Sequence, residues 1–242
     1  MSEQFSAISC LFIIFVGFPL LFVGYRAFSE WGHNKAWGEV ATALGWRYQR
    51  HGAGLPNRAM ALVPQFTQGL VLHTAEGVHE GVPFYLCELK PVTLGGNQHM
   101  NPPTAVVAFD CAAVGMTLPA FLIRPKGLTD GLKAYMGYRF ARIPTPYNED
   151  VTFMLVGDDP AFEEAVAKLP KKFWKQLRDW GTWGTYCVSD GEWLVYLRRD
   201  VTVVPTIEAM PYLVQRALHC YKLLNTHLQP FAPLGKEKPA YE

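Results

Sequence analysis

Sequence signatures of the common enzyme classes are absent from this chain. There is no GxSxG nucleophile motif, no P-loop and no GxGxxG fingerprint, and none of the seven histidines falls in HExxH or zinc-finger spacing. A triad assembled from distant parts of the chain stays open as an alternative, because triads form in space and not in sequence. The sequence therefore predicts no catalytic residue, no cofactor and no metal site, and it favours a non-enzymatic protein.

An excess of charge of either sign is also lacking. Lys and Arg number 22 against 21 for Asp and Glu, so no basic field suited to nucleic acid is expected. The five cysteines are widely spaced and form no CxxC pair, which argues against a disulfide framework and against a CxxC metal or redox site. This usage is in keeping with a reducing compartment.

Charged residues are missing altogether from residues 5–25, FSAISCLFIIFVGFPLLFVGY. An apolar run of about 20 residues matches the thickness of a bilayer core. The alternative is a cleaved signal peptide, but residues 1–4 carry no Lys or Arg and no good cleavage site follows. The sequence therefore predicts an uncleaved transmembrane anchor over residues 1–28.

Positive charge lies only on the C-terminal side of this span, at Arg26 and Lys35. The positive-inside rule then places the N-terminus outside and the following domain in the cytoplasm, which makes the chain a single-pass protein of the bacterial inner membrane. The span contains no ionisable residue, so it offers no haem ligand and no proton relay. It is expected to act as an anchor and a packing surface.

Beyond the anchor, the pattern predicts an α+β fold: one N-terminal transmembrane helix, then an antiparallel-sheet soluble domain with two long helices near the C-terminus. The expected divisions are a connecting helix in 29–50, the α+β domain in 51–228 and an extended, Pro-containing tail in 229–242. The expected strands are 69–74, 82–89, 104–111, 120–124, 151–156, 185–188 and 192–197, and the expected helices are 29–44, 127–138, 158–180 and 206–228.

The polar residues that could carry chemistry have ordinary structural readings. Asp158 and Asp159 precede Pro160 and are expected to cap a helix, and Asp190 is expected in a hairpin turn. A basic run is interleaved with aromatics at residues 168–178, and it is expected to be a solvated helix face, with a lipid-facing helix as the alternative. His33 is expected to be exposed near the headgroups.

Two segments carry a resemblance to a known group: AFLIRPKGL at 120–128 and PYNEDVTFMLVGDDPAFEEAV at 146–166. They resemble a pattern of uncharacterised bacterial single-pass membrane proteins with an N-terminal anchor and an α+β soluble domain. The resemblance covers residues 40–225 and implies architecture but no reaction. Tyr147-Asn148-Glu149 departs from the Glu-Phe-Asn phrase of that pattern.

Aromatic residues are frequent at 14%, and four of them follow the span closely: Tyr25, Phe28, Trp31 and Trp37. They do not share one helical face, so some are expected to contact lipid headgroups or another chain. The sequence thus favours an accessory or scaffold subunit of a larger integral membrane complex, with the bilayer and other membrane subunits as partners. Respiratory and photosynthetic complexes are the natural candidates. The alternatives are a membrane-tethered hydrolase with a dispersed site, which a pocket gathering two histidines and a carboxylate would favour, and a lipid- or ligand-binding domain.

Overall fold

A computed structural model describes residues 18–51, 55–62, 69–91, 103–115, 118–125, 139–140, 151–155, 164, 166–179, 185–198 and 203–228. Its strands are β1 (Arg47–Arg50), β2 (Gly69–His79), β3 (Val82–Pro91), β4 (Thr104–Asp110), β5 (Phe121–Pro125), β6 (Arg139–Phe140), β7 (Val151–Leu155), β8 (Thr185–Ser189) and β9 (Trp193–Arg198). Its helices are α2 (Phe18–Ala43), α3 (Asn57–Ala61), the 3₁₀ turn η2 (Ala112–Val114), α6 (Lys171–Asp179) and α7 (Ala209–Leu228).

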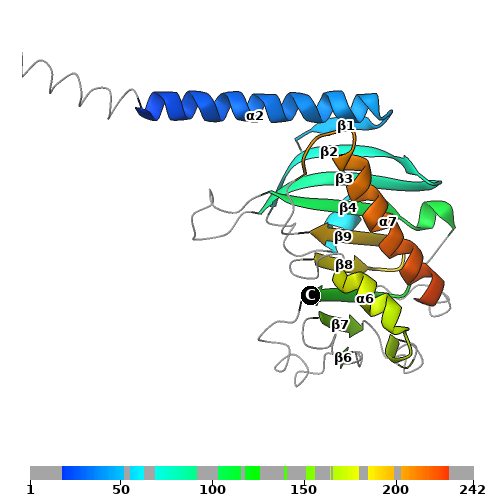
Figure 1. The fold of residues 1–242 in the computed structure, drawn as a ribbon. Helices are drawn as coiled ribbons and strands as arrows, with labels where there is room; N and C mark the ends of the chain where they lie inside the picture. The colour runs from blue at the N-terminus through cyan, green and yellow to red at the C-terminus, as the bar shows by residue number, and fades with distance from the viewer. Residues whose placement is uncertain are drawn as a thin grey trace, which may run out of the picture.

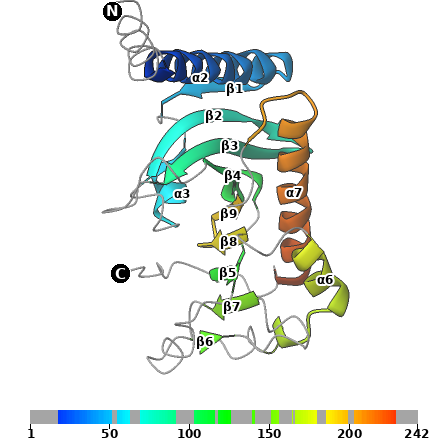
Figure 2. The same cartoon turned by 60° about the vertical axis from the view of Figure 1, so that its left-hand side comes forward.

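The strands form one sheet in the order β1-β2-β3-β4-β9-β8-β5-β7-β6, and every neighbouring pair is antiparallel (Figure 1). The sheet therefore confirms the α+β class with an antiparallel sheet. Helix α2 lies against β1 and β2 at one edge of this sheet. Helix α7 runs across the strands, with α6 beside its C-terminal end (Figure 2).

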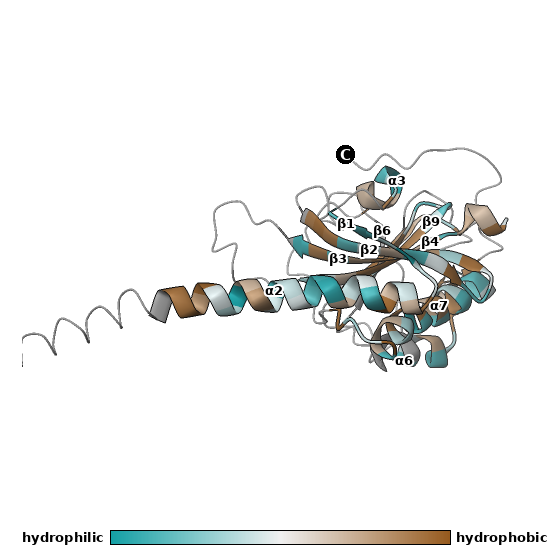
Figure 3. Ribbon diagram, turned by 90° about the horizontal axis from the view of Figure 1, so that it is seen from above, coloured by the Kyte–Doolittle hydropathy of each residue, from teal (hydrophilic) through white to brown (hydrophobic). Residues whose placement is uncertain are grey.

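The two faces of the sheet bury different sets of side chains, as the alternation along each strand requires. On the α7 face, Phe84, Leu86 and Val107 pack with residues of α2, α6 and α7. On the opposite face, Cys87 and Val106 pack with residues of α3. Figure 3 shows α3 on one side of the sheet and α6 and α7 on the other.

Most of the predicted strands are confirmed to within a few residues, but the first hairpin is tighter than expected. The predicted connection at residues 75–81 is mostly strand, and the turn is reduced to Glu80-Gly81. Both residues have positive φ, 48° and 81°, which is the backbone of a two-residue hairpin turn. The second hairpin, around Asp190-Gly191, lies where the sequence predicted it.

The two C-terminal helices differ from each other in length. Helix α7 has 20 residues, is capped by Thr206 through a 3.0 Å hydrogen bond from the Ala209 amide, and buries the predicted apolar stripe. The other expected helix is divided near Pro170, so α6 has only nine residues. The predicted helix at 127–138, the first residues of the one at 158–180 and the tail at 229–242 lie outside the described residues.

Helix α2 is longer than the connecting helix that the sequence predicted. It begins at Phe18, within the expected span, and runs unbroken to Ala43, and Gly45 with a φ of 72° follows its end. Residues 1–17, which hold most of the expected span, lie outside the described residues. Within the part of the chain that the structure describes, no helix has the length and apolar character needed to cross a bilayer.

Candidate functional site

A buried carboxylate on β3 is the centre of the polar site. Glu88 follows Phe84 and Leu86 at alternating positions, so its side chain enters the same face of the sheet as theirs, and it is 0% exposed. On the neighbouring strand β2, His73 is paired directly with Glu88. A β-bulge between Val71 and His73 shifts the register there, so Val71 packs on the α3 face while His73 points toward α2.

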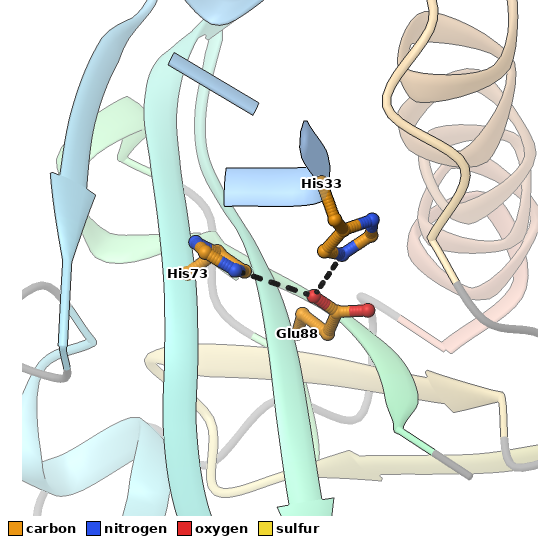
Figure 4. A group of neighbouring side chains, drawn as sticks. All are labelled: His33, His73 and Glu88. Atoms are coloured by element: carbon orange, nitrogen blue, oxygen red, sulfur yellow. Dashed lines mark hydrogen bonds and ion pairs between the residues drawn. The ribbon is translucent and has the colours of Figure 1, made fainter. Parts of the chain in front are cut away.

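Helix α2 supplies the third polar group. His33 reaches down from α2 and places Nε2 2.8 Å from Glu88 Oε2, while His73 Nε2 lies 3.7 Å from the same oxygen (Figure 4). The two imidazoles meet edge to face, with ring centroids 5.5 Å apart. One turn along the helix, Trp37 stacks on the His73 ring at 5.2 Å, which fixes that ring between an indole and the carboxylate.

The two histidines have opposite electrostatic character. The hydrogen bond to the Glu88 carboxylate raises the pKa of His33, which favours the imidazolium form. Burial lowers the pKa of His73 to about 4, with a further contribution from the positive charge of His33, so His73 is neutral at pH 7. Tyr48, whose own pKa is raised by burial, places its hydroxyl 2.9 Å from His73 Nδ1. His73 thus has both ring nitrogens directed at oxygen atoms.

Two polar atoms at this site have no hydrogen-bond partner among the described residues. They are Oε1 of Glu88 and Nε1 of Trp37, both in fully buried side chains. Unpartnered buried oxygens of a carboxylate are rare, because leaving such a group without water or a hydrogen bond is costly. Among the described residues, only one oxygen of the Glu88 carboxylate therefore has a hydrogen-bond partner.

The arrangement holds α2 against the sheet and is open to solvent only on one side. The His33 side chain is 32% exposed, whereas those of His73 and Glu88 are 3% and 0% exposed. A molecule approaching from water can thus touch His33 directly but not the other two groups. Trp37 and Ala41, also on α2, are fully buried in the same face of the core.

Of the four residues predicted to contact membrane or partner, the structure leaves three exposed and buries one. Tyr25, Phe28 and Trp31 are 73%, 70% and 59% exposed, and Trp37 is 0% exposed. The prediction for Trp37 is therefore corrected: it packs in this chain's own core, because it shares the helical face of His33 and Ala41 that meets the sheet.

The exposed part of α2, residues 20–31, is called the arm here, and it projects beyond the edge of the sheet (Figures 1 and 3). At 100° per residue, its outward stripe consists of Leu20, Leu21, Tyr25, Phe28 and Trp31, on the side away from the residues that dock α2. Arg26 and Glu30, paired at 3.1 Å, lie on the docking side. The exposed Phe22 and Val23 make the arm apolar all round at its start. From Tyr25 onward it is apolar on one side only.

The other residues weighed from the sequence have structural roles where they are described. The Asp190 carboxylate accepts hydrogen bonds from the Trp193 amide and from Arg58, as a turn residue would. In the basic run, Lys171 and Lys175 are exposed, while Phe173 and Trp174 are buried, so the aromatics face the core and not the basic surface. The exposed lysines fit a solvated helix face and also a helix that lies against anionic lipid, so the solvated face stays a prediction. Asp158 and Asp159 lie outside the described residues.

His33 is partly exposed, and its hydrogen bond to Glu88 and the grouping of His33, His73 and Glu88 were not predicted. One signal was present: a carboxylate at an inward position of a strand that is otherwise apolar, two residues after Leu86. The sequence around His73 gave no such signal, because the β-bulge decides which face of the sheet its side chain lies on.

Comparison with known proteins adds little to this site. No protein-family model and no curated protein matches the chain. Among solved structures, the chain is similar to the mycobacterial trehalose monomycolate transport factor A, TtfA, with 12% identity, a TM-score of 0.46, and coverage of 85% of this chain and 99% of that one. At this level the likeness supports no inference about function.

Proposed function

We propose that this protein is a non-enzymatic accessory subunit that uses the arm of α2 to contact a membrane-embedded partner protein. The observation that carries the proposal is the outward stripe, whose five side chains are each 59–74% exposed. Side chains of this size are usually buried, and a contiguous exposed apolar surface commonly marks an interaction site.

The docking of α2 makes the arm suitable for such a contact. Trp37 and Ala41 are fully buried and His33 is hydrogen-bonded to Glu88, so the second half of the helix is held on the sheet. An unbroken helix transmits this orientation to the arm, which is about 18 Å long at 1.5 Å per residue. The stripe is therefore presented in a fixed direction, which lowers the entropy lost on binding.

In the part of the arm that follows Tyr25, the distribution of charge favours contact with a protein and not with lipid alone. A helix surrounded by lipid is apolar on every side, whereas Arg26 and Glu30 occupy the docking side of the arm. Lys35 lies over the Trp31 ring at 5.5 Å, near the end of the stripe. A one-sided apolar face with aromatic residues suits a groove or helix of another subunit.

Attachment to the membrane by residues 5–25, with the domain on the cytoplasmic side, is part of this proposal. It is supported by the uncharged run and by the positive residues Arg26 and Lys35 that follow it. A cytoplasmic reporter fused after Glu242 should be active and a periplasmic reporter silent. Activity of the periplasmic reporter would refute this orientation.

The contact itself is tested by replacing Trp31 with alanine and quantifying by mass spectrometry the proteins that co-purify in mild detergent. Tyr212→Ala is the matched control, because Tyr212 is a large aromatic on α7, exposed to 58%, and lies outside the arm. We expect Trp31→Ala to reduce one specific partner at least severalfold while the membrane-bound amount stays constant. Equal co-purification by both variants and the wild type would contradict the proposal.

A membrane-tethered hydrolase is the second candidate, and the meeting of His33, His73 and Glu88 is the observation in its favour. Of these groups only His33 is open to solvent, so a substrate would reach one member of the set directly. The geometry suits holding α2 in place better than it suits turnover.

A further inference from the structure

The three polar groups under α2 have the composition and spacing of a metal site. His33, His73 and Glu88 each offer one ligand atom, and these atoms lie within 4.8 Å of one another. Zinc bonds of about 2.0–2.1 Å in tetrahedral geometry set neighbouring ligand atoms roughly 3.3 Å apart. The two distances to Glu88 Oε2, 2.8 Å from His33 and 3.7 Å from His73, fall on either side of that value.

We propose that His33, His73 and Glu88 bind a single divalent transition-metal ion of the Zn²⁺ class that fastens α2 to β2 and β3. The ligands come from three elements, α2, β2 and β3, that are far apart in sequence. Binding would thus add a link between the arm and the sheet. This inference does not depend on what the arm contacts.

A second, independent observation also points to a ligand at this position. Oε1 of Glu88 has no hydrogen-bond partner among the described residues, although the side chain is completely buried. A metal ion that binds the carboxylate through both of its oxygens would satisfy Oε1 as well as Oε2.

The surroundings of His73 resemble those of a metal-bound histidine. Such a histidine commonly uses its other ring nitrogen in a hydrogen bond that fixes the ring orientation and the tautomer. Here Tyr48 Oη is 2.9 Å from His73 Nδ1, and Trp37 stacks on the ring. With Nδ1 engaged by Tyr48, Nε2 faces Glu88.

The donor set decides the class of metal. Two imidazoles and one carboxylate suit Zn²⁺ and related transition ions, whereas Mg²⁺ and Ca²⁺ prefer oxygen ligands alone. Three protein ligands leave a fourth position for water, on the side where His33 is open to solvent.

The test is calorimetric titration of Zn²⁺ into the untagged full chain in detergent after treatment with a chelator, repeated with Co²⁺ to record its absorption spectrum. We expect one ion per chain, no competition from excess Mg²⁺, and a higher melting temperature with Zn²⁺ bound. His33→Ala should weaken binding more than 100-fold. Tyr48→Phe, which alters only the hydrogen bond behind His73, should weaken it by about 10–100-fold.

His219→Ala is the matched control, because His219 is an exposed histidine on α7 that is not among the three ligands. It should bind Zn²⁺ as the wild type does. Circular dichroism establishes that each variant is folded, and His33→Ala decides the outcome if Glu88→Gln fails to fold. Absence of Zn²⁺ uptake by the wild type, or uptake that His33→Ala leaves unchanged, would overturn the proposal.

Discussion

Replacing His33 with alanine should destabilise the domain, and a second substitution at Glu88 should reverse part of the effect. In the metal-free protein His33 is the hydrogen-bonded partner of a completely buried carboxylate, at 2.8 Å. His73 is the other group near this carboxylate, but its Nε2 lies 3.7 Å from Glu88 Oε2, which is longer than a hydrogen bond. Alanine at position 33 therefore leaves the completely buried Glu88 carboxyl group without its hydrogen-bond partner.

The expected magnitude follows from the burial of the two partners. Breaking a buried ion pair by removing one member typically costs about 3–5 kcal/mol. Because the His33 side chain is 32% exposed, water reaches one side of the pair, and we expect a lower value of about 2–3 kcal/mol. This corresponds to a decrease in melting temperature of roughly 5–10 °C for a domain of this size.

Glu88→Gln keeps the shape of the side chain and removes the charge, so we expect it to cost less, about 1 kcal/mol. Combined with His33→Ala it should restore stability above that of His33→Ala alone, because no buried charge is then stranded. The coupling energy in this double-mutant cycle should exceed about 1 kcal/mol.

The assay is thermal unfolding of the full chain in detergent at pH 7 with a chelator present, supported by hydrogen exchange of the amides of α2. His219→Ala, at an exposed position of α7, serves as the control and should change stability by less than about 0.5 kcal/mol. The reasoning would be refuted if His33→Ala melted with the wild type, or if the double variant were as unstable as the sum of the single ones.

Three further predictions concern packing and capping. Leu218→Asp should prevent folding, because it places an unpaired charge at a 0% exposed position of α7. Tyr212→Asp, at an exposed position of the same helix, should express normally. Wild-type abundance of Leu218→Asp would show that α7 is not part of the core. Trp37→Ala should lower the free energy of unfolding by about 3–5 kcal/mol, measured in denaturant, because the indole is fully buried and stacks on His73; a loss below 1 kcal/mol would mean that α2 is not docked there. Thr206→Ala should lower the free energy of unfolding by about 1 kcal/mol, because the α7 cap is lost, and Thr206→Ser should restore it. An unchanged melting temperature of Thr206→Ala would show that this cap does not stabilise the protein.

The sequence was informative where local pattern and tertiary structure agree. The apolar stripe of α7 has helical spacing and all eight of its predicted members are buried. The Ser189-Asp190-Gly191 turn carries its own backbone preference, and the strands on both sides pair as expected. In these elements the residues that decide the structure are neighbours in the chain.

The polar site could not be predicted in the same way, because it depends on contacts between distant elements. His33 and Glu88 are 55 residues apart, and their meeting requires α2 to lie across the edge of the sheet. One β-bulge decides on which face of the sheet the His73 side chain lies, and no residue preference in the sequence predicts that bulge. Trp37 was assigned to a partner because the aromatic residues cannot share one face, and the sequence does not say which face the sheet will cover.

The most direct test of the central claim, that the arm contacts a partner protein, is a photocrosslinking scan of positions 20 to 31 in native membranes. All of these side chains are exposed in the structure, so each position can carry the probe without disturbing the core. If a protein covers the outward stripe, crosslinks to one polypeptide should recur every three to four residues, strongest at Tyr25, Phe28 and Trp31 and absent at Arg26 and Glu30. Crosslinks to lipid at every position, with no periodicity and no protein adduct, would contradict the account.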